Sequence, residues 1–179
     1  MDPDVLDARL DALRNEWEGV NADDGQRVRL QAQILEILFD QIPAERGAVL
    51  LSWPDASGDD PEDFYSSLYR RRSGRLTEGF ELSGKALEFV YGKGRAHMSN
   101  TARPALLCAA LTLPDGEIFG LIYLDTCEIG RFERHDLRVL KKITAVAEEL
   151  IHDSLRIRFM EDINQIYGNV RNVEPWDPD

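Results

Sequence analysis

The stretch PALLCAALTLPDGEIFGLIYLDT, from Pro104 to Thr126, decides the fold. It places two apolar segments of strand length on either side of Pro-Asp-Gly, a tripeptide typical of a tight turn. Both segments are apolar at alternate and at intervening positions, so neither has a face suited to water. The pattern therefore predicts a β-hairpin of two central strands, with both faces of the sheet covered by other parts of the chain.

Three further strands are predicted around this hairpin. The continuous apolar run GAVLLSW, residues 47–53, is too short for a helix and indicates another central strand. FYSSLYRRR, residues 64–72, reads as a strand whose arginines lie at a sheet edge, where positive charge discourages further pairing. The segment AHMSN, residues 96–100, predicts a short strand.

Helical patterns account for most of the remaining chain. Apolar residues recur every three or four positions in two N-terminal segments, the first beginning at Pro3, and in a long last segment that starts near Glu133. A short helix is expected with Ser83 as its N-cap and Gly92 at its end. The predicted fold class is α+β: an antiparallel central sheet of about five to six strands with helices on both faces.

The junction between the hairpin and the last helix has a structural explanation. Asp125 would end the central strand, and Phe132 could fix the following turn against the core. Glu133 and Asp136 would lie in the first helical turn, where negative charge suits the helix dipole. This junction is therefore expected to hold the last helix against the sheet.

Charge and hydropathy exclude several functional classes. The chain of 179 residues has 33 Asp plus Glu against 21 Lys plus Arg, a net charge of -12, so a phosphate backbone would repel it and nucleic-acid binding is not expected. No apolar run reaches the roughly 18 residues that a membrane span needs, and the acidic N-terminus is unlike a signal peptide. We expect a cytoplasmic protein that does not bind membranes.

The order of these segments resembles a GAF domain, over roughly Arg27 to Arg156. IPAERGAVLL, YRRR, the short helix with its glycine turn, the quoted hairpin and GRFERHDLRVLKKITAVAEELI follow the family's element order. The likeness is greatest to GAF domains of bacterial signalling proteins, such as those beside forkhead-associated domains or in enhancer-binding transcription regulators. It implies an N-terminal helix and linker over 1–24, a GAF-like domain over 25–158, and a helical extension with a linker tail over 159–179.

The resemblance implies a non-catalytic sensory or regulatory domain that binds a small ligand. Inward residues of the central strands would line the pocket, with the short helix opposite, and from alternation we expect these to be Leu107, Phe119, Leu121, Tyr123 and Ser83. Cyclic-nucleotide-binding members carry an Asn-Lys pair and a Phe-x-x-x-Asp-Glu element, of which only Phe132 and Asp136 match. No cofactor is assigned from the sequence.

A homodimer is predicted through the terminal helices. The first helix lies outside the GAF-like region, and an isolated amphipathic helix needs a partner to cover its apolar face. The residues expected at this interface are Leu6, Leu10, Leu13, Trp17 and Ile151.

Two alternatives remain open. Only SNTAR, residues 99–103, is available where ligand-binding GAF domains carry a larger lid, so the pocket could be filled and the chain an interaction scaffold. The other alternative is a thiol enzyme like the GAF-fold reductases of free methionine sulfoxide. Cys108 is expected opposite about Ile122 in the hairpin, roughly 16 Å from Cys127, which disfavours a redox pair.

No metal site is predicted. His97, His135 and His152 are too scattered to converge on an ion, and only His97 could be proposed as a haem ligand. GKGR, residues 92–95, is interpreted as a helix end and turn because it lacks the longer pattern of a phosphate loop.

Overall fold

The computed structural model describes residues 3–20, 23–52, 64–75, 80–94, 96–101 and 103–170. The predicted linker tail beyond Val170 lies outside this range. The helices and strands are, in chain order, α1 Pro3–Trp17, α2 Asp24–Gln41, β1 Arg46–Ser52, β2 Phe64–Arg71, β3 Gly74–Arg75, α3 Gly84–Lys93, β4 His97–Ser99, β5 Ala105–Thr112, β6 Ile118–Thr126 and α4 Arg134–Val170.

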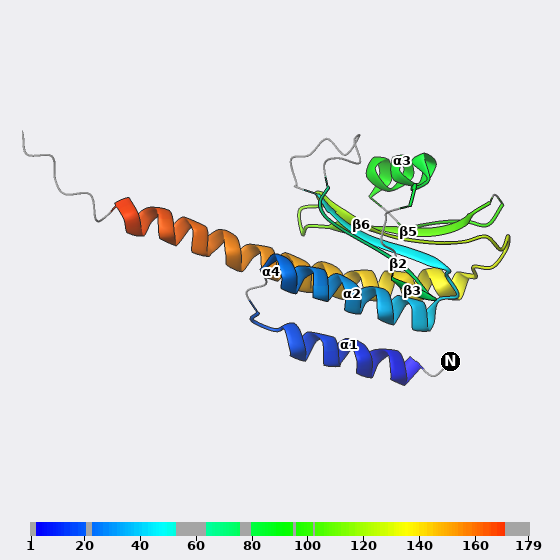
Figure 1. The fold of residues 1–179 in the computed structure, drawn as a ribbon, viewed down its shortest axis with the longest axis horizontal. Helices are drawn as coiled ribbons and strands as arrows, with labels where there is room; N and C mark the ends of the chain where they lie inside the picture. Colours follow the sequence, from blue (N-terminus) through cyan, green and yellow to red (C-terminus); the bar gives the residue numbers. More distant parts are fainter. Residues whose placement is uncertain are drawn as a thin grey trace, which may run out of the picture.

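The six strands form one antiparallel sheet in the order β3-β2-β1-β6-β5-β4. The three strands with continuous apolar sequences, β1, β6 and β5, are adjacent in its middle, as their composition predicts. Helices α2 and α4 cover one face of the sheet, and α3 covers the other (Figure 1). The expected α+β fold with helices on both faces is confirmed.

Two hydrophobic cores result, one on each face of the sheet. The larger lies against α2 and α4 and contains Val49 and Leu124. The smaller lies against α3 and contains Ala48, Leu50 and Tyr123. Since successive strand residues point to opposite faces, neighbours along β1 contribute to different cores. A strand that contributes to both hydrophobic cores must therefore be apolar on both of its faces.

Helix α1 belongs to the larger core. Its residues Leu6, Leu10, Leu13 and Trp17 are between 2% and 7% exposed, and Figure 1 shows α1 against the outer side of the α2 and α4 layer. The Trp17 Nε1 atom donates a hydrogen bond of 2.6 Å to Oε1 of Gln33 on α2. The inference that α1 needs a second copy to cover it was wrong, because its own chain provides the partner.

Ile151, the fifth residue expected at a dimer interface, is 1% exposed in the same core. It belongs to the predicted apolar stripe of the last helix, whose members Leu140, Thr144, Ala147 and Ser154 are also buried. The stripe therefore faces the chain's own core. Beyond it, the C-terminal part of α4 projects past the sheet (Figure 1).

The helix ends show which local signals were interpreted correctly. Asp23 caps α2 through a capping box with Gln26, with hydrogen bonds of 2.7 and 3.0 Å, a signal that the sequence analysis missed. Ser83 occupies the N-cap of α3 but makes no capping bond with its side chain. Helix α3 ends at Gly94, with φ of 57°, and not at Gly92 as predicted.

The junction between β6 and α4 is fixed as expected, with one addition. Phe132 is 2% exposed, and Oδ2 of Asp136 accepts a hydrogen bond of 2.7 Å from the Glu133 backbone N–H. The side-chain amide of Asn100 also binds both the backbone N–H and the carbonyl oxygen of Phe132, at 3.3 and 2.5 Å. The loop before β5 is thereby tied to the start of α4.

None of the described helices combines the length and the apolar character that a membrane crossing requires. In the described part of the chain, no three His, Cys, Asp or Glu side chains gather where they could hold a metal ion.

We predict that Gly120→Ala strongly destabilises the protein. A Cβ atom at Gly120 would lie 2.4 Å from the carbonyl oxygen of Leu50, a backbone atom of the paired strand that cannot move aside without disturbing the sheet. The free energy of unfolding, measured with urea, should fall by at least about 2 kcal/mol. Gly92→Ala in α3, which has open space around its Cβ position, is the control. An equal effect of both changes would contradict the close approach of β1 and β6.

The intramolecular packing of α1 predicts the effect of Leu10→Ala. Leu10 is 2% exposed, so truncation should lower the free energy of unfolding by about 2–5 kcal/mol. Val5→Ala on the same helix, where Val5 is 51% exposed, should have little effect. The loss should be independent of protein concentration. A loss that grows on dilution would instead mean that α1 is stabilised by a second copy.

Candidate functional site

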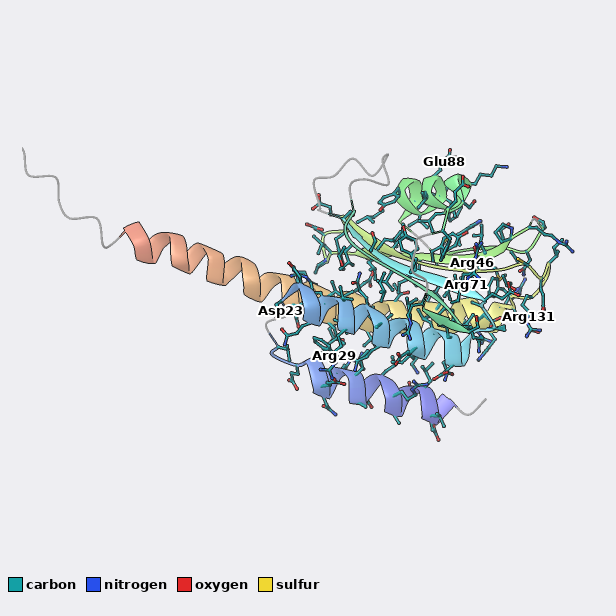
Figure 2. All side chains as sticks on the ribbon, viewed as in Figure 1. Asp23, Arg29, Arg46, Arg71, Glu88 and Arg131 are labelled. Atoms are coloured by element: carbon teal, nitrogen blue, oxygen red, sulfur yellow. The ribbon has the colours of Figure 1, made fainter. Side chains whose placement is uncertain are left out.

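Charged residues meet where β1, β2 and β6 end on the α3 face of the sheet. Arg46 begins β1, and the strand register places it opposite Arg71 on β2 and opposite Asp125 on β6. Arg46 and Arg71 lie at the same end of the sheet (Figure 2). We call this region the strand-end site.

Arg46 and Asp125 form a two-bond ion pair. The Nε and Nη2 atoms of Arg46 donate to Oδ1 and Oδ2 of Asp125 at 2.8 and 2.6 Å. The Asp125 side chain is 1% exposed and that of Arg46 is 28% exposed. The hydrogen bonds to Asp125 raise the pKa of Arg46. Such a pair holds the guanidinium plane in one orientation at the edge of the buried layer.

Three aromatic rings adjoin the ion pair. Phe80 packs edge-on against Tyr69 with ring centroids 5.2 Å apart, and lies 6.0 Å from the ring of Tyr123. The guanidinium carbon of Arg46 lies 4.6 Å from the centroid of Phe80, within range of a cation–π contact. The rings and the arginine thus form one packed group on the α3 face.

The Tyr123 hydroxyl is a fully buried polar atom of this group for which the described residues form no hydrogen bond. The residue is 1% exposed, and its oxygen meets no described partner at full hydrogen-bond geometry, although the Asp125 carboxylate and the Ser83 backbone lie near it. Burial raises the pKa of the Tyr123 phenol, and the nearby Asp125 carboxylate raises it further. The hydroxyl therefore stays protonated at neutral pH and can donate a hydrogen bond.

A half-open cleft of about 420 Å³ adjoins the ion pair. Its volume is in the range of sites for small molecules. The exposed Cys127 forms part of its wall, and the Cys127 backbone N–H donates a hydrogen bond of 3.1 Å to Oε2 of Glu45. Among the described residues, the cleft is lined by Glu45, Arg46, Arg71, Ser73 and Cys127.

The three consecutive arginines of the YRRR run have different surroundings. Arg70, on the opposite face of β2, binds Glu36 of α2 at 2.7 Å. Arg72 binds the carbonyl oxygens of Ala44 and Ile42, at 2.9 and 2.5 Å, at the end of α2. Arg71 is exposed in the cleft and makes no ion pair with any described residue.

The structure places only part of the predicted pocket on the α3 face of the sheet, and none of its five residues lines the cleft. Leu121 and Tyr123 face α3, at whose N-terminus Ser83 lies. Leu107 and Phe119 were assigned to the wrong face, because both lie fully buried in the core against α2 and α4.

A β-bulge explains this error. Leu111 pairs with Gly120 whereas Thr112 pairs with Ile118, so Phe119 is an extra residue on β6. The bulge turns Phe119 away from the face of Leu121 despite their spacing of two. It also shifts the register, so that Cys108 lies opposite Tyr123 and not Ile122. Leu107, expected beside Tyr123, therefore points to the other core.

The two cysteines are free and in different surroundings. Burial raises the pKa of the Cys108 thiol to about 12, so it is protonated and a poor nucleophile at neutral pH. Cys127 lies four residues beyond the partner of Cys108 along β6, or about 13 Å at the rise of a strand. That separation is beyond the reach of a disulfide, as predicted.

His97 stacks on Phe89 with ring centroids 4.1 Å apart, and burial lowers the pKa of His97.

The sequence analysis did not select Arg46, and it interpreted Asp125 only as the end of a strand. Their pairing joins residues separated by 79 positions, and no local pattern signals it.

No protein-family model matches the chain, and no curated protein matches its sequence. Solved structures match its fold at low identity. The GAF domain of the phosphoenolpyruvate-protein phosphotransferase from Acinetobacter aligns with a TM-score of 0.57 and 11% identity, over 88% of this chain and 98% of that domain. A GAF sensor protein from Burkholderia vietnamiensis aligns with a TM-score of 0.60 and 13% identity, over 87% and 92%.

An enzyme shares the same fold. Free methionine-R-sulfoxide reductase from Neisseria meningitidis, solved in complex with its substrate, aligns with a TM-score of 0.58 and 13% identity, over 86% of this chain and 92% of the enzyme. Sensor domains and an enzyme are thus similar to this chain in structure. The chain has the fold of a GAF domain.

Proposed function

We propose that this chain is a non-catalytic sensory or regulatory domain of a bacterial signalling or transcription-regulating protein, and that it binds a small ligand at the strand-end site. The observation that carries the proposal is the cleft of about 420 Å³ at the fixed Arg46–Asp125 pair, with the buried Tyr123 hydroxyl close to the pair but not on the cleft wall. A buried polar group without a partner costs about 1–3 kcal/mol. A ligand that extends from the cleft past the ion pair and accepts the Tyr123 hydrogen bond would recover part of this cost.

The position of the site suggests how ligand binding is transmitted. Strand β6 carries Tyr123 and Asp125, and the chain continues within a few residues through Phe132 into α4. Asn100 holds this junction from the other side. A ligand that shifts the end of β6 would therefore bias the position of α4, which projects beyond the domain (Figure 1).

We also propose a homodimer in which the projecting part of α4 takes part. A helical segment that extends beyond the body of its own domain is only marginally stable by itself in water, so a partner for this extension is favoured. The α1 residues and Ile151 do not support the interface, because the chain's own core covers them.

Native mass spectrometry of freshly purified protein tests the proposal. We expect a dimer with added mass that is released on denaturation. Tyr123→Phe should weaken retention of this ligand up to about tenfold, by loss of one hydrogen bond, without lowering thermal stability. Tyr69→Phe, on the same aromatic wall, is the matched control. A clean spectrum with no added mass would favour the ligand-free scaffold, whereas a ligand retained equally by the unaltered chain and by Tyr123→Phe would remove Tyr123 from the binding site.

A thiol-dependent reductase of methionine sulfoxide is the second candidate, favoured by the position of Cys127 on the cleft wall and by the fold shared with the Neisseria enzyme. The wide separation of Cys127 from Cys108 opposes it. We expect the purified protein with a thiol reductant to reduce no free methionine sulfoxide. Turnover that is lost in Cys127→Ser and kept in Cys108→Ser would overturn the non-catalytic assignment.

A further inference from the structure

We infer that Arg71 and Arg46 make the strand-end cleft a binding site for an anionic group, a carboxylate or a phosphate. The inference rests on the proposed function, since it gives the chemical class of the ligand for that same site. Arg71 is the principal binding residue, and Arg46 supports it.

Of the three consecutive arginines Arg70, Arg71 and Arg72, Arg71 is the one whose side chain makes neither an ion pair nor a hydrogen bond with a described residue. Its neighbours Arg70 and Arg72 bind partners on α2 and at its C-terminal end, which accounts for their presence. The Arg71 side chain contributes no such contact between described elements. In the β1–β2 pair, Arg71 lies directly opposite Arg46. Asp125 offsets the charge of Arg46, whereas Arg71 makes no ion pair with any described residue, so Arg71 is the arginine of this facing pair that an anion could still bind.

Arg46 keeps donors available for a ligand. Asp125 takes one N–H group from Nε and one from Nη2, which leaves three of the five N–H groups of a guanidinium without a described bond. The ring of Phe80 packs against this guanidinium, so its orientation is fixed before any ligand arrives. A fixed donor loses little conformational freedom on binding.

The rest of the lining limits what the cleft accepts. Ser73 supplies a hydroxyl, which can donate to a carboxylate or phosphate oxygen. Glu45 is the negative residue of the lining, and one of its oxygens already accepts the Cys127 backbone N–H. Asp125 is neutralised by Arg46. The anionic group should therefore bind at the Arg71 side of the cleft, away from Glu45.

Because of the negative net charge of the chain, an anion can bind only where local contacts overcome the general repulsion. At a net charge of -12, the protein as a whole repels small anions. An anion that binds here must do so through local contacts with the arginines and not through general attraction. Binding should be specific to Arg71 even when ionic strength is held constant.

The test is an NMR titration of the full ¹⁵N-labelled chain with inorganic phosphate and, separately, with succinate, at constant ionic strength. We expect saturable shifts of the Arg71 side-chain Nε–H and of the Ser73 backbone amide. Arg71→Gln should weaken anion binding at least tenfold, since charge-assisted hydrogen bonds are lost. Arg70→Gln, the adjacent arginine on the other face, is the matched control and should leave binding unchanged. The stronger of the two probes identifies the anionic group as phosphate or carboxylate.

Glu45→Gln tests whether the ligand of the cleft is negatively charged. Removal of this negative charge should strengthen binding of both anions a few-fold. Linear shifts without saturation, equal losses in the Arg70 and Arg71 variants, or weaker binding in Glu45→Gln would each overturn the inference. A retained ligand that depends on Tyr123, together with a failed anion titration, would leave the proposed function standing and remove this inference alone.

Discussion

Strands β1, β6 and β5 are apolar on both faces, and the rest of the fold satisfies this one constraint. Any uncovered face would expose a contiguous apolar patch to water. Helices α2 and α4 cover one face and α3 covers the other, while α1 covers the outer side of the helical layer. The close approach of β1 and β6 at Gly120 shows how tightly the central strands are packed.

The same constraint explains where polar chemistry can occur. Inside the sheet a charge is tolerated only when it is paired, and the one strongly buried carboxylate of the central strands, Asp125, binds Arg46 with two hydrogen bonds. The pair lies at the strand ends, where the cover by α3 gives way to an open cleft. The site is thus rigid on its inner side and accessible on its outer side, which suits recognition of a small molecule.

The neighbours of this fold include sensor domains and an enzyme, so the fold alone does not select a function. The local chemistry differs around the groups on which the two proposed functions depend. Cys108 is buried and protonated, and Cys127 is far from it, whereas arginines, aromatic rings and an unpaired phenol lie together. The proposal of a binding function rests on this arrangement. Since β6 contributes to the site and leads into α4, the binding residues and the exit of the chain belong to one continuous element.

The sequence by itself determined most of the secondary-structure elements, the central strands and the α+β architecture, because these depend on local periodicity and turn residues; it missed the two-residue strand β3. It also indicated that Tyr123 and Leu121 face the short helix. Only the tertiary structure decided that a bulge at Phe119 turns this residue and Leu107 to the opposite core. It alone joined Arg46 to Asp125, gave α1 its partner, and left one arginine of three facing the cleft. The physical reason is that these outcomes depend on strand register and on contacts between distant residues, whereas hydrophobic pattern is local.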